Sequence, residues 1–461
     1  MEGAVKSAAE ALPSEVLERI FSYCTQKDLV QSIQNVCSRW REVAQSTRLW
    51  KRVTYCPSEN TSSEQIVKML KISPKLQNLI LKIEHGDAVL HAITENCAEL
   101  KKLQISELPD LDLNFLKNLQ EKCPKVEHLS IPDTVLTDLD KCEVVAKFVN
   151  LKVLILTRFR EKRGSVYLKP LADHCKELEH LEFQHMKFEM NDLRHFLCMR
   201  KGTLHTLGLR CCSESGECVL PVVSTCMLET LSLFSFSVCC RHAEKIKYFR
   251  RLKTVRALTI EDLQFTKPDL IKKIFENENM AQLRKLSLYR AYSFNDEVTD
   301  VIVTNCPLLQ SLTLDLCEMM TDASLKMVTN FKQLSSLTLS TNNKITDAGI
   351  FHLQDVKGLN YLRIECCERV TKLGMNSIVN LSTLRDLKLR RQDLSEFQWD
   401  LIPHNMKYLR CLDINSCGED IVAIKKMKRQ LPGLRVSLDG NTSSEYCTVD
   451  DSLNLSYEFF P

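Results

Sequence analysis

Along most of the chain, hydrophobic residues recur in one spacing. A first apolar residue is followed by a second one three positions later and by a third one five positions after the first. This pattern begins at fifteen places, and successive copies begin 24 to 28 residues apart. The first apolar residues of the copies are Leu76, Leu100, Val126, Leu151, Leu178, Leu204, Leu228, Val255, Leu283, Leu309, Leu334, Leu359, Leu384, Leu409 and Leu434. Such regular spacing predicts an array of similar units from residue 76 onward.

Each copy predicts one short strand, because alternate side chains of a strand face opposite sides. Leu312 and Leu314 would point into a core, whereas Thr313 and Asp315 would face outward. An amphipathic segment follows each strand, and Thr346 can cap one such helix. Strands stack at about 4.8 Å and helices at about 10 Å, so the array must curve with its strands inside. We therefore expect an α/β leucine-rich-repeat horseshoe of about 15 repeats, with parallel strands on the concave face and helices on the convex face.

Residues before the array follow a different, helical spacing of apolar positions. Residues 12–21 predict a first helix, and Thr25–Asp28 reads as a capping box that opens a second helix. Residues 40–43 and 49–53 predict a third helix and a short closing one. The second helix would place Leu29, Ile33 and Val36 on one side. A module of about forty residues buries little surface alone, so it is expected to need a partner or a neighbouring domain.

This module resembles the F-box. It carries the L-P-x-E-[IVL]-L-x-x-I-F-x-[YF] opening from Leu12, then Asp28-Leu29, V-C-x-x-W ending at Trp40, and Leu49-Trp50. With the array, nearly the whole chain resembles the F-box and leucine-rich-repeat proteins, which are substrate receptors of SCF-type cullin-RING ubiquitin ligases. The resemblance implies that the small all-helical F-box binds an adaptor subunit, and through it the cullin scaffold and RING subunit. The repeats would then hold a protein substrate.

Several residues fall on F-box motif positions that make or support the adaptor contact in that family. They are Leu12, Pro13, Glu15, Leu17, Ile20, Leu29, Val36, Trp40 and Trp50. Leu17, Ile20 and Trp40 could equally be internal core residues of the module.

The predicted organisation has five segments. They are a flexible N-terminus at 1–10, the F-box at 11–56, a connector at 57–75, the leucine-rich-repeat solenoid at 76–438 and an acidic tail at 439–461. The tail has five carboxylates and no Lys or Arg, whereas the array is basic. We expect the tail to lie along the inner face of the array, and a disordered terminus is the alternative.

The array resembles the cysteine-containing leucine-rich repeats, because eight of the 21 cysteines recur at two places in the repeat. Cys97, Cys123, Cys175 and Cys306 precede the strand leucine by three residues, and Cys212, Cys317, Cys367 and Cys417 follow it by eight. The resemblance implies that the second set is buried and helps satisfy loop backbone groups. A metal site at Cys211, Cys212, Cys218, Cys239, Cys240 and His242 is the rival interpretation. It is disfavoured because no C-x-x-C pair has zinc spacing, and we expect no metal and no cofactor.

Composition restricts the partners. The formal net charge of +3 gives no strong attraction to nucleic acid or to a membrane surface. The first residues lack the apolar core of a signal peptide, and no run of 18 apolar residues follows, so we expect a cytoplasmic or nuclear protein with reduced thiols. No phosphate loop, nucleophile elbow or zinc motif is present, which favours a non-catalytic receptor. A scaffold, or a small-ligand-dependent sensor that does not deliver ubiquitin, remains the alternative.

Outward-facing strand positions and strand ends are rich in arginine and aromatic residues, the types enriched in binding hot spots. The candidate substrate-binding residues are Arg158, Phe159, Arg160, Arg210, Phe234, Tyr289, Arg290, Tyr292, Tyr361, Arg363, Lys388, Arg390 and Arg391. Phe236 and Phe294 belong to the same runs. Because arginine can clamp a carboxylate or phosphate with two hydrogen bonds, we expect an acidic or phosphorylated protein substrate.

Overall fold

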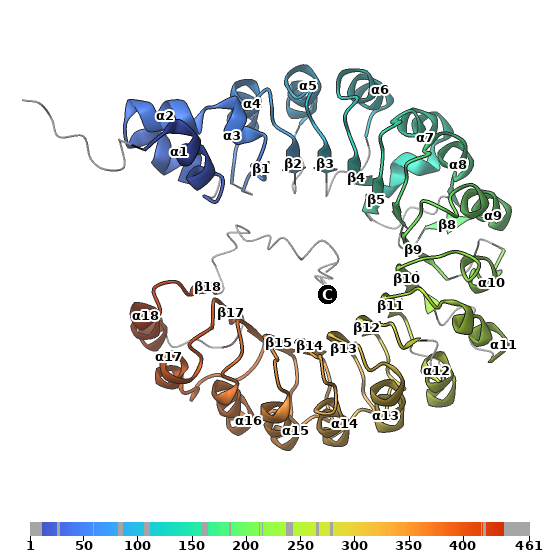
Figure 1. Cartoon of the computed structure of the whole chain (residues 1–461), viewed down its shortest axis with the longest axis vertical. Helices are drawn as coiled ribbons and strands as arrows, with labels where there is room; N and C mark the ends of the chain where they lie inside the picture. Colours follow the sequence, from blue (N-terminus) through green and yellow to red (C-terminus); the bar gives the residue numbers. More distant parts are fainter. Residues whose placement is uncertain are drawn as a thin grey trace, which may run out of the picture. The chain divides into compact units, whose positions relative to one another are not determined.

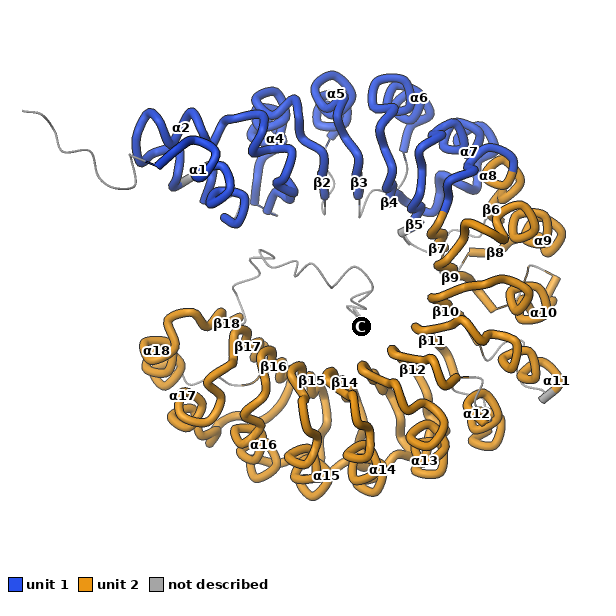
Figure 2. Tube along the Cα trace, viewed as in Figure 1, with its two compact units in different colours: residues 1–162, 173–178, 443–461 blue, residues 163–172, 179–442 orange. Residues whose placement is uncertain are grey.

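A computed structural model of the chain divides into two compact units (Figures 1 and 2). Unit 1 holds residues 1–162, 173–178 and 443–461, and unit 2 holds residues 163–172 and 179–442. The structure describes residues 12–24, 28–58, 60–81, 86–105, 111–157, 165–183, 186–211, 213, 215–236, 243–263, 267–276, 280–415, 417 and 421–437. The expected flexible N-terminus and acidic tail lie outside these residues, so their placement stays a prediction.

Unit 1 begins with the helical module. Its helices are α1 (Ser14–Phe21), α2 (Ser38–Ala44) and α3 (Thr47–Trp50). The expected capping box at 25–28 falls largely outside the described residues. Asp28–Asn35 forms two short non-α helical turns rather than one regular helix, which corrects that prediction. Leu29 and Ile33 are buried as expected, but Val36 lies past the last turn with 58% of its surface exposed.

The repeats of unit 1 follow. The strands are β1 (Thr54–Tyr55), β2 (Asn78–Leu81), β3 (Lys102–Ile105), β4 (His128–Pro132) and β5 (Val153–Thr157), and the helices are α4 (Ser63–Ile72), α5 (Asp87–Asn96), α6 (Leu113–Lys122) and α7 (Leu139–Ala146). All neighbouring strands pair in parallel, in sequence order. Strand β1 and helix α4 precede Leu76, so the solenoid begins earlier than expected. Strand β1 lies at the end of the segment predicted as the F-box, and α4 lies in the predicted connector.

Unit 2 continues the same alternation. Its strands are β6 (Ser165–Val166), β7 (His180–Phe183), β8 (Lys187–Phe188), β9 (Thr206–Arg210), β10 (Thr230–Phe234), β11 (Ala257–Glu261), β12 (Lys285–Tyr289), β13 (Ser311–Asp315), β14 (Ser336–Ser340), β15 (Tyr361–Glu365), β16 (Asp386–Arg390), β17 (Cys411–Asp413) and β18 (Arg435–Ser437). Its helices are α9 (Met190–Met199), α10 (Leu220–Val223), α11 (Ala243–Ile246), α12 (Pro268–Phe275), α13 (Asp296–Asn305), α14 (Asp322–Val328), α15 (Asp347–His352), α16 (Lys372–Ser377), α17 (Ile402–Asn405) and α18 (Ile421–Gln430); α8 (Lys169–His174) crosses the unit boundary. Strand β6 pairs only with β8, and the others form the repeat sheet.

Equal spacing of the repeats sets the register of the sheet in unit 2. Leu312 of β13 pairs with Leu337 of β14, which pairs with Leu362 of β15 and then with Leu387 of β16. These side chains are at most 2% exposed, so they form one continuous core row. Within each unit the strands lie on the inner side and the helices on the outer side (Figure 1). The leucine-rich-repeat fold expected from the sequence is thus confirmed.

Buried cysteines bond to backbone carbonyls between repeats. The thiol of Cys123 donates to the carbonyl of Cys97 at 3.4 Å, and the thiol of Cys417 donates to the carbonyl of Leu389 at 3.1 Å. Asn342 takes the same repeat position as Cys417 and donates to the carbonyl of Leu314 at 3.1 Å. Leu314 and Leu389 are strand residues of the preceding repeat, and the thiol of Cys417 also donates to the loop carbonyl of Asn415 at 3.3 Å, as the resemblance implies. Burial raises the thiol pKa of Cys123 to about 11, so the group is a neutral donor.

A second interrepeat contact links the helix starts of unit 2. The carboxylate of Asp322 accepts the backbone N–H of Thr346 at 2.8 Å and its hydroxyl at 2.6 Å. The hydroxyl oxygen of Thr346 accepts from the amide of Ala348, so Thr346 caps α15 as the sequence predicted. A Cβ atom at Gly349 would overlap the Asp322 carboxylate. Glycine is therefore required there by close approach of the neighbouring repeat.

Within the described residues, no helix combines the length and the apolar character needed to cross a membrane. The same residues contain no group of three His, Cys, Asp or Glu side chains placed to hold a metal ion. Cys212, Cys239, Cys240 and His242, part of the rival metal interpretation, lie outside the described residues.

Candidate protein-binding surfaces

Helix α1 separates its apolar residues onto two faces. Leu17 and Phe21, four positions apart, are each only 1% exposed and fill the core of the module. Val16 and Ile20, also four positions apart, are 41% and 46% exposed, and Tyr23 beyond the helix is 82% exposed. Residues four apart lie on one side of a helix. The helix thus buries one apolar stripe and presents another to solvent.

The exposed stripe is held in place by a packed interior. The indole N–H of the fully buried Trp50 donates to the carbonyl of Ala44 at 3.1 Å. The ring of Trp40 meets that of Phe21 edge to face, with 5.1 Å between centroids. Edge-to-face aromatic pairs stabilise a core beyond the area they bury. Leu29 is also fully buried.

Polar contacts tie α1 to the rest of the module. One guanidinium N–H of Arg39 donates to the carbonyl of Leu12 at 2.5 Å, which fixes the residue before the helix. The hydroxyl of Ser46 donates to the carboxylate of Glu18 at 2.6 Å. These two bonds connect the start and middle of α1 to α2 and to the start of α3.

The structure therefore sorts the nine F-box residues named from the sequence. Pro13, Glu15, Ile20 and Val36 are exposed, Leu12 and Trp40 are half-buried, and Leu17, Leu29 and Trp50 are buried. The buried three support the surface from within and cannot touch a partner directly. Sequence reasoning missed Val16 and Tyr23, which the spacing of Val16, Ile20 and Tyr23 at positions i, i+4 and i+7 could have identified.

The second surface is the concave face of unit 2, formed by the strand side chains that point away from the leucine core. On β15 these are Tyr361, Arg363 and Glu365, all half-buried, and they alternate with the buried Leu362 and Ile364. The sheet register continues this face onto β16. On β16, Asp386 lies beside Tyr361, Lys388 beside Arg363 and Arg390 beside Glu365.

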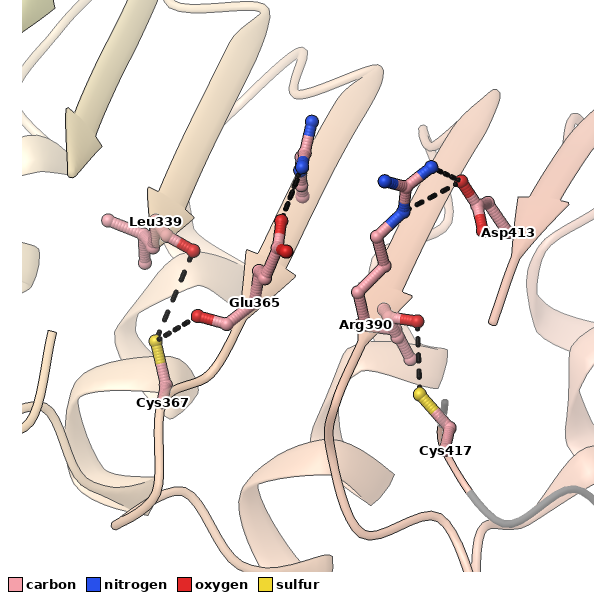
Figure 3. Close-up of polar contacts among 8 residues, drawn as sticks. Leu339, Glu365, Cys367, Arg390, Asp413 and Cys417 are labelled. Carbon is pink, nitrogen blue, oxygen red and sulfur yellow. Dashed lines mark hydrogen bonds and ion pairs between the residues drawn. The ribbon is translucent and has the colours of Figure 1, made fainter. Parts of the chain in front are cut away.

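Two arginines on this face are already paired with carboxylates of the same chain (Figure 3). Arg390 donates from Nε at 3.1 Å and from Nη2 at 2.8 Å to one oxygen, Oδ2, of Asp413. Arg363 donates to Oε2 of Glu365, from Nε at 3.0 Å and also from Nη2. The side chains of Asp413 and Glu365 are 8% and 19% exposed, whereas those of Arg390 and Arg363 are 30% and 29% exposed. The carboxylates thus lie deeper than the guanidinium groups that they hold.

Lys388 makes a different contact. Its ammonium group lies 5.5 Å from the centroid of the Tyr361 ring, a cation–π distance. It forms no ion pair within the described part of the chain. Asp386, which pairs with Tyr361 in the register, brings a further carboxylate to this end of the face.

The middle of the face also carries carboxylates. Burial, helped by the nearby Asp315 carboxylate, raises the pKa of Tyr289. Burial also raises the pKa of Asp315, although a hydrogen bond from Ser340 opposes that shift, and the negative charge of Glu365 adds to it. Glu261, on the strand next to Tyr289, is 3% exposed. These carboxylates sit at the last position of their strands, where the sequence analysis had singled out only cations and aromatics.

The structure changes the predicted substrate surface in several places. Phe234 is fully buried, so it is a core residue and cannot line an open surface; Phe236 and Phe294 are likewise buried. The aromatic ring is shielded from solvent in each case. Arg210, Tyr289, Arg290, Tyr292, Tyr361, Arg363, Lys388 and Arg390 are half-buried, and Arg391 is exposed. Arg158, Phe159 and Arg160 lie outside the described residues.

Arg290 and Arg391 occupy an unusual backbone conformation directly after their strands. Their φ angles are +52° and +49°, and the same left-handed conformation recurs at Leu316, Thr341 and Cys366. The amide of Thr341 donates to the carbonyl of Glu365 in the next repeat at 2.9 Å. Interrepeat hydrogen bonding thus offsets the cost of this conformation in non-glycine residues.

Comparison with known proteins agrees with both parts of the chain. The F-box-like family model matches residues 9–56. A chain of the Rad7–Elc1 complex of yeast is 16% identical, with a TM-score of 0.53, over 97% of this chain and 100% of that one. A leucine-rich-repeat protein of Leptospira interrogans is 16% identical, with a TM-score of 0.36, over 80% of this chain and 91% of that one. The chain accordingly carries an F-box-like domain at residues 9–56 and has a leucine-rich-repeat fold.

Proposed function

We propose that this chain is the substrate-recognition subunit of an SCF-type ubiquitin ligase. Its F-box would bind the adaptor subunit, and through it the cullin and RING subunits, while the concave face of the repeats binds a protein substrate. The observation that carries the proposal is the exposed stripe of Val16, Ile20 and Tyr23 on a module whose interior is already filled by Leu17 and Phe21. An apolar stripe of this kind is stabilised when a partner covers it.

The proposed role requires no catalytic group in the chain itself. A receptor that holds a substrate beside a ubiquitin-charged enzyme raises the effective concentration of the substrate lysine. The solenoid suits this role, because parallel strands present a long row of side chains from successive repeats. The Rad7–Elc1 structure is a complex of two proteins, and a chain of it has the same fold as this one, which supports the proposal that this chain also binds a partner.

Capture of the purified adaptor by the full-length chain tests the proposal. Ile20→Glu places a charge in the exposed stripe and should abolish capture, because desolvating an unpaired carboxylate in an apolar interface is costly. Ile421→Glu is the matched control, since Ile421 is 52% exposed on α18 of unit 2, compared with 46% for Ile20. The control should retain capture. Capture by the Ile20→Glu chain equal to that of the control would contradict the proposal.

A further inference from the structure

The end of the concave face at β15 and β16 has the construction of an anion-binding site. Arg363 and Lys388 are register partners on adjacent strands, and Arg390 lies two residues further along β16. Their side chains point away from the leucine core and toward the same face. Three long cations are thus brought together by a register that the 25-residue repeat spacing fixes.

The two guanidinium groups are fixed along one edge only. In both Arg363 and Arg390, Nε and Nη2 bond to a single carboxylate oxygen, of Glu365 and Asp413 respectively. Nη1 has no hydrogen-bond partner among the described residues in either arginine. A guanidinium held in this way keeps its position while it still offers donors to a ligand. Fixing donors in advance lowers the entropy cost of binding.

The formal charges at this end are balanced: Arg363, Lys388 and Arg390 supply three cations, and Glu365, Asp386 and Asp413 supply three carboxylates. Glu365 and Asp413 are the more deeply buried groups and their bonded oxygens are occupied. Lys388 rests on an aromatic ring rather than on a carboxylate, so its charge is available to a ligand. The donors left for a ligand are Nη1 of Arg363, Nη1 of Arg390 and the ammonium group of Lys388.

We infer that this cluster binds an oxyanion, a phosphate or a carboxylate, on a segment of the substrate protein. Arg363, Lys388 and Arg390 contact the anion, and Glu365 and Asp413 act as positioning residues for the two guanidinium groups. Two oriented guanidinium groups match the geometry of an oxyanion, and charge-assisted bonds of this type are strong. The inference rests on the proposed function, because it names the class of substrate segment that the same face receives.

Binding of labelled peptide pools to the full-length chain tests the inference. The pools have random flanks around a fixed centre of phosphoserine, glutamate, serine or lysine, and fluorescence anisotropy gives the dissociation constant of each. The phosphoserine or glutamate pool should bind roughly tenfold more tightly than the serine pool, the difference expected of one charge-assisted hydrogen-bond pair. Phosphoserine binding above glutamate assigns the anion to a phosphate, and equal binding assigns it to a carboxylate. Equal binding of all pools, or preference for lysine, would overturn the inference.

Variants then locate the site. Lys388→Met and Arg390→Lys should each weaken binding of the anionic pool several-fold, the first by removing a charge and the second by removing the planar fork. Arg385→Gln is the matched control, because Arg385 is an exposed arginine just before β16 that does not belong to the cluster. It should leave binding unchanged. A control that weakens binding as much as the cluster variants would overturn the assignment.

The positioning role predicts an effect opposite in sign to a simple electrostatic one. Asp413→Asn makes the face more positive, so a site that acted only through its net charge would bind the anionic pool more tightly. If Asp413 positions Arg390, the same variant should bind several-fold more weakly. Glu365→Gln repeats the comparison at Arg363 in case Asp413→Asn does not fold. Tighter binding in either folded variant would overturn the positioning role. Adaptor capture is measured in parallel, so that failure of peptide binding alone leaves the proposed function standing.

Discussion

The carboxylate of Asp296 accepts the backbone N–H of Thr321 at 3.0 Å and the hydroxyl of Thr321 at 2.7 Å, across two successive repeats. The hydroxyl of Ser324 donates to the same carboxylate at 2.6 Å. Burial acts to raise the pKa of Asp296, but the bonds from Ser324 and Thr321 outweigh it and hold the pKa below its usual value. The ionised carboxylate therefore stabilises the junction between α13 and α14.

This contact predicts a pH-dependent stability. Asp296→Asn should lower the free energy of unfolding at pH 7 by about 1.5–3 kcal/mol, the range for hydrogen bonds to a charged group. Because the pKa is lower in the folded chain, the contribution is complete above the unfolded-state value of about 3.9 and is lost as pH falls through the folded-state value. Urea denaturation at pH 7 and below pH 4 measures the difference. Asp300→Asn, at an exposed position of the same helix, is the control, and equal stability of both variants at pH 7 would contradict the prediction.

Gly349 should tolerate no side chain. Gly349→Ala brings a Cβ atom into the Asp322 carboxylate, so the repeat must shift or lose the bonds to Thr346. We expect a loss of about 1–3 kcal/mol in the free energy of unfolding, the usual cost of overpacking. Gly202→Ala meets nothing within 4 Å and should be nearly neutral. Similar thermal midpoints for the two variants would show that the neighbouring repeat can move away without cost.

Asn342 should be replaceable by cysteine more readily than by an apolar residue. The side chain is fully buried, donates to the carbonyl of Leu314 and accepts the amide of Cys317 at 2.9 Å. Asn342→Cys keeps a weak donor, as Cys367 does one repeat later, whereas Asn342→Val leaves both backbone groups unsatisfied. We expect Asn342→Val to be less stable than Asn342→Cys by about 1–2 kcal/mol in chemical denaturation. The reverse order would refute the role assigned to this position.

Replacing Leu12 and Pro13 by alanine should weaken adaptor capture. Both residues lie at the start of α1, where Leu12 is half-buried and Pro13 is exposed. Loss of their apolar area should reduce affinity roughly tenfold, judged from the free energy of burying side chains of this size. Leu139→Ala, at a position 45% exposed on α7, controls for loss of an exposed leucine elsewhere. Unchanged titration of the adaptor would mean that this end of α1 lies outside the interface.

The sequence alone determined the repeat array and the helical module. The leucines that pair from Leu312 to Leu387 could be placed because burial in a strand follows a period of two and the repeat spacing is constant. The capping role of Thr346 was equally readable, because a cap depends on residues a few positions away. Features set by local spacing were thus accessible without coordinates.

Tertiary structure decided which side chains are available for contact. Phe234 falls on an outward strand position, yet its side chain is completely buried in the folded chain. Arg390 and Asp413 are 23 residues apart, and only the sheet register brings them to 2.8 Å. The split of α1 into a buried stripe at Leu17 and an exposed one at Ile20 depends in the same way on what the neighbouring helices cover. Burial and ion pairing are properties of the whole packed surface, so no window of sequence contains them.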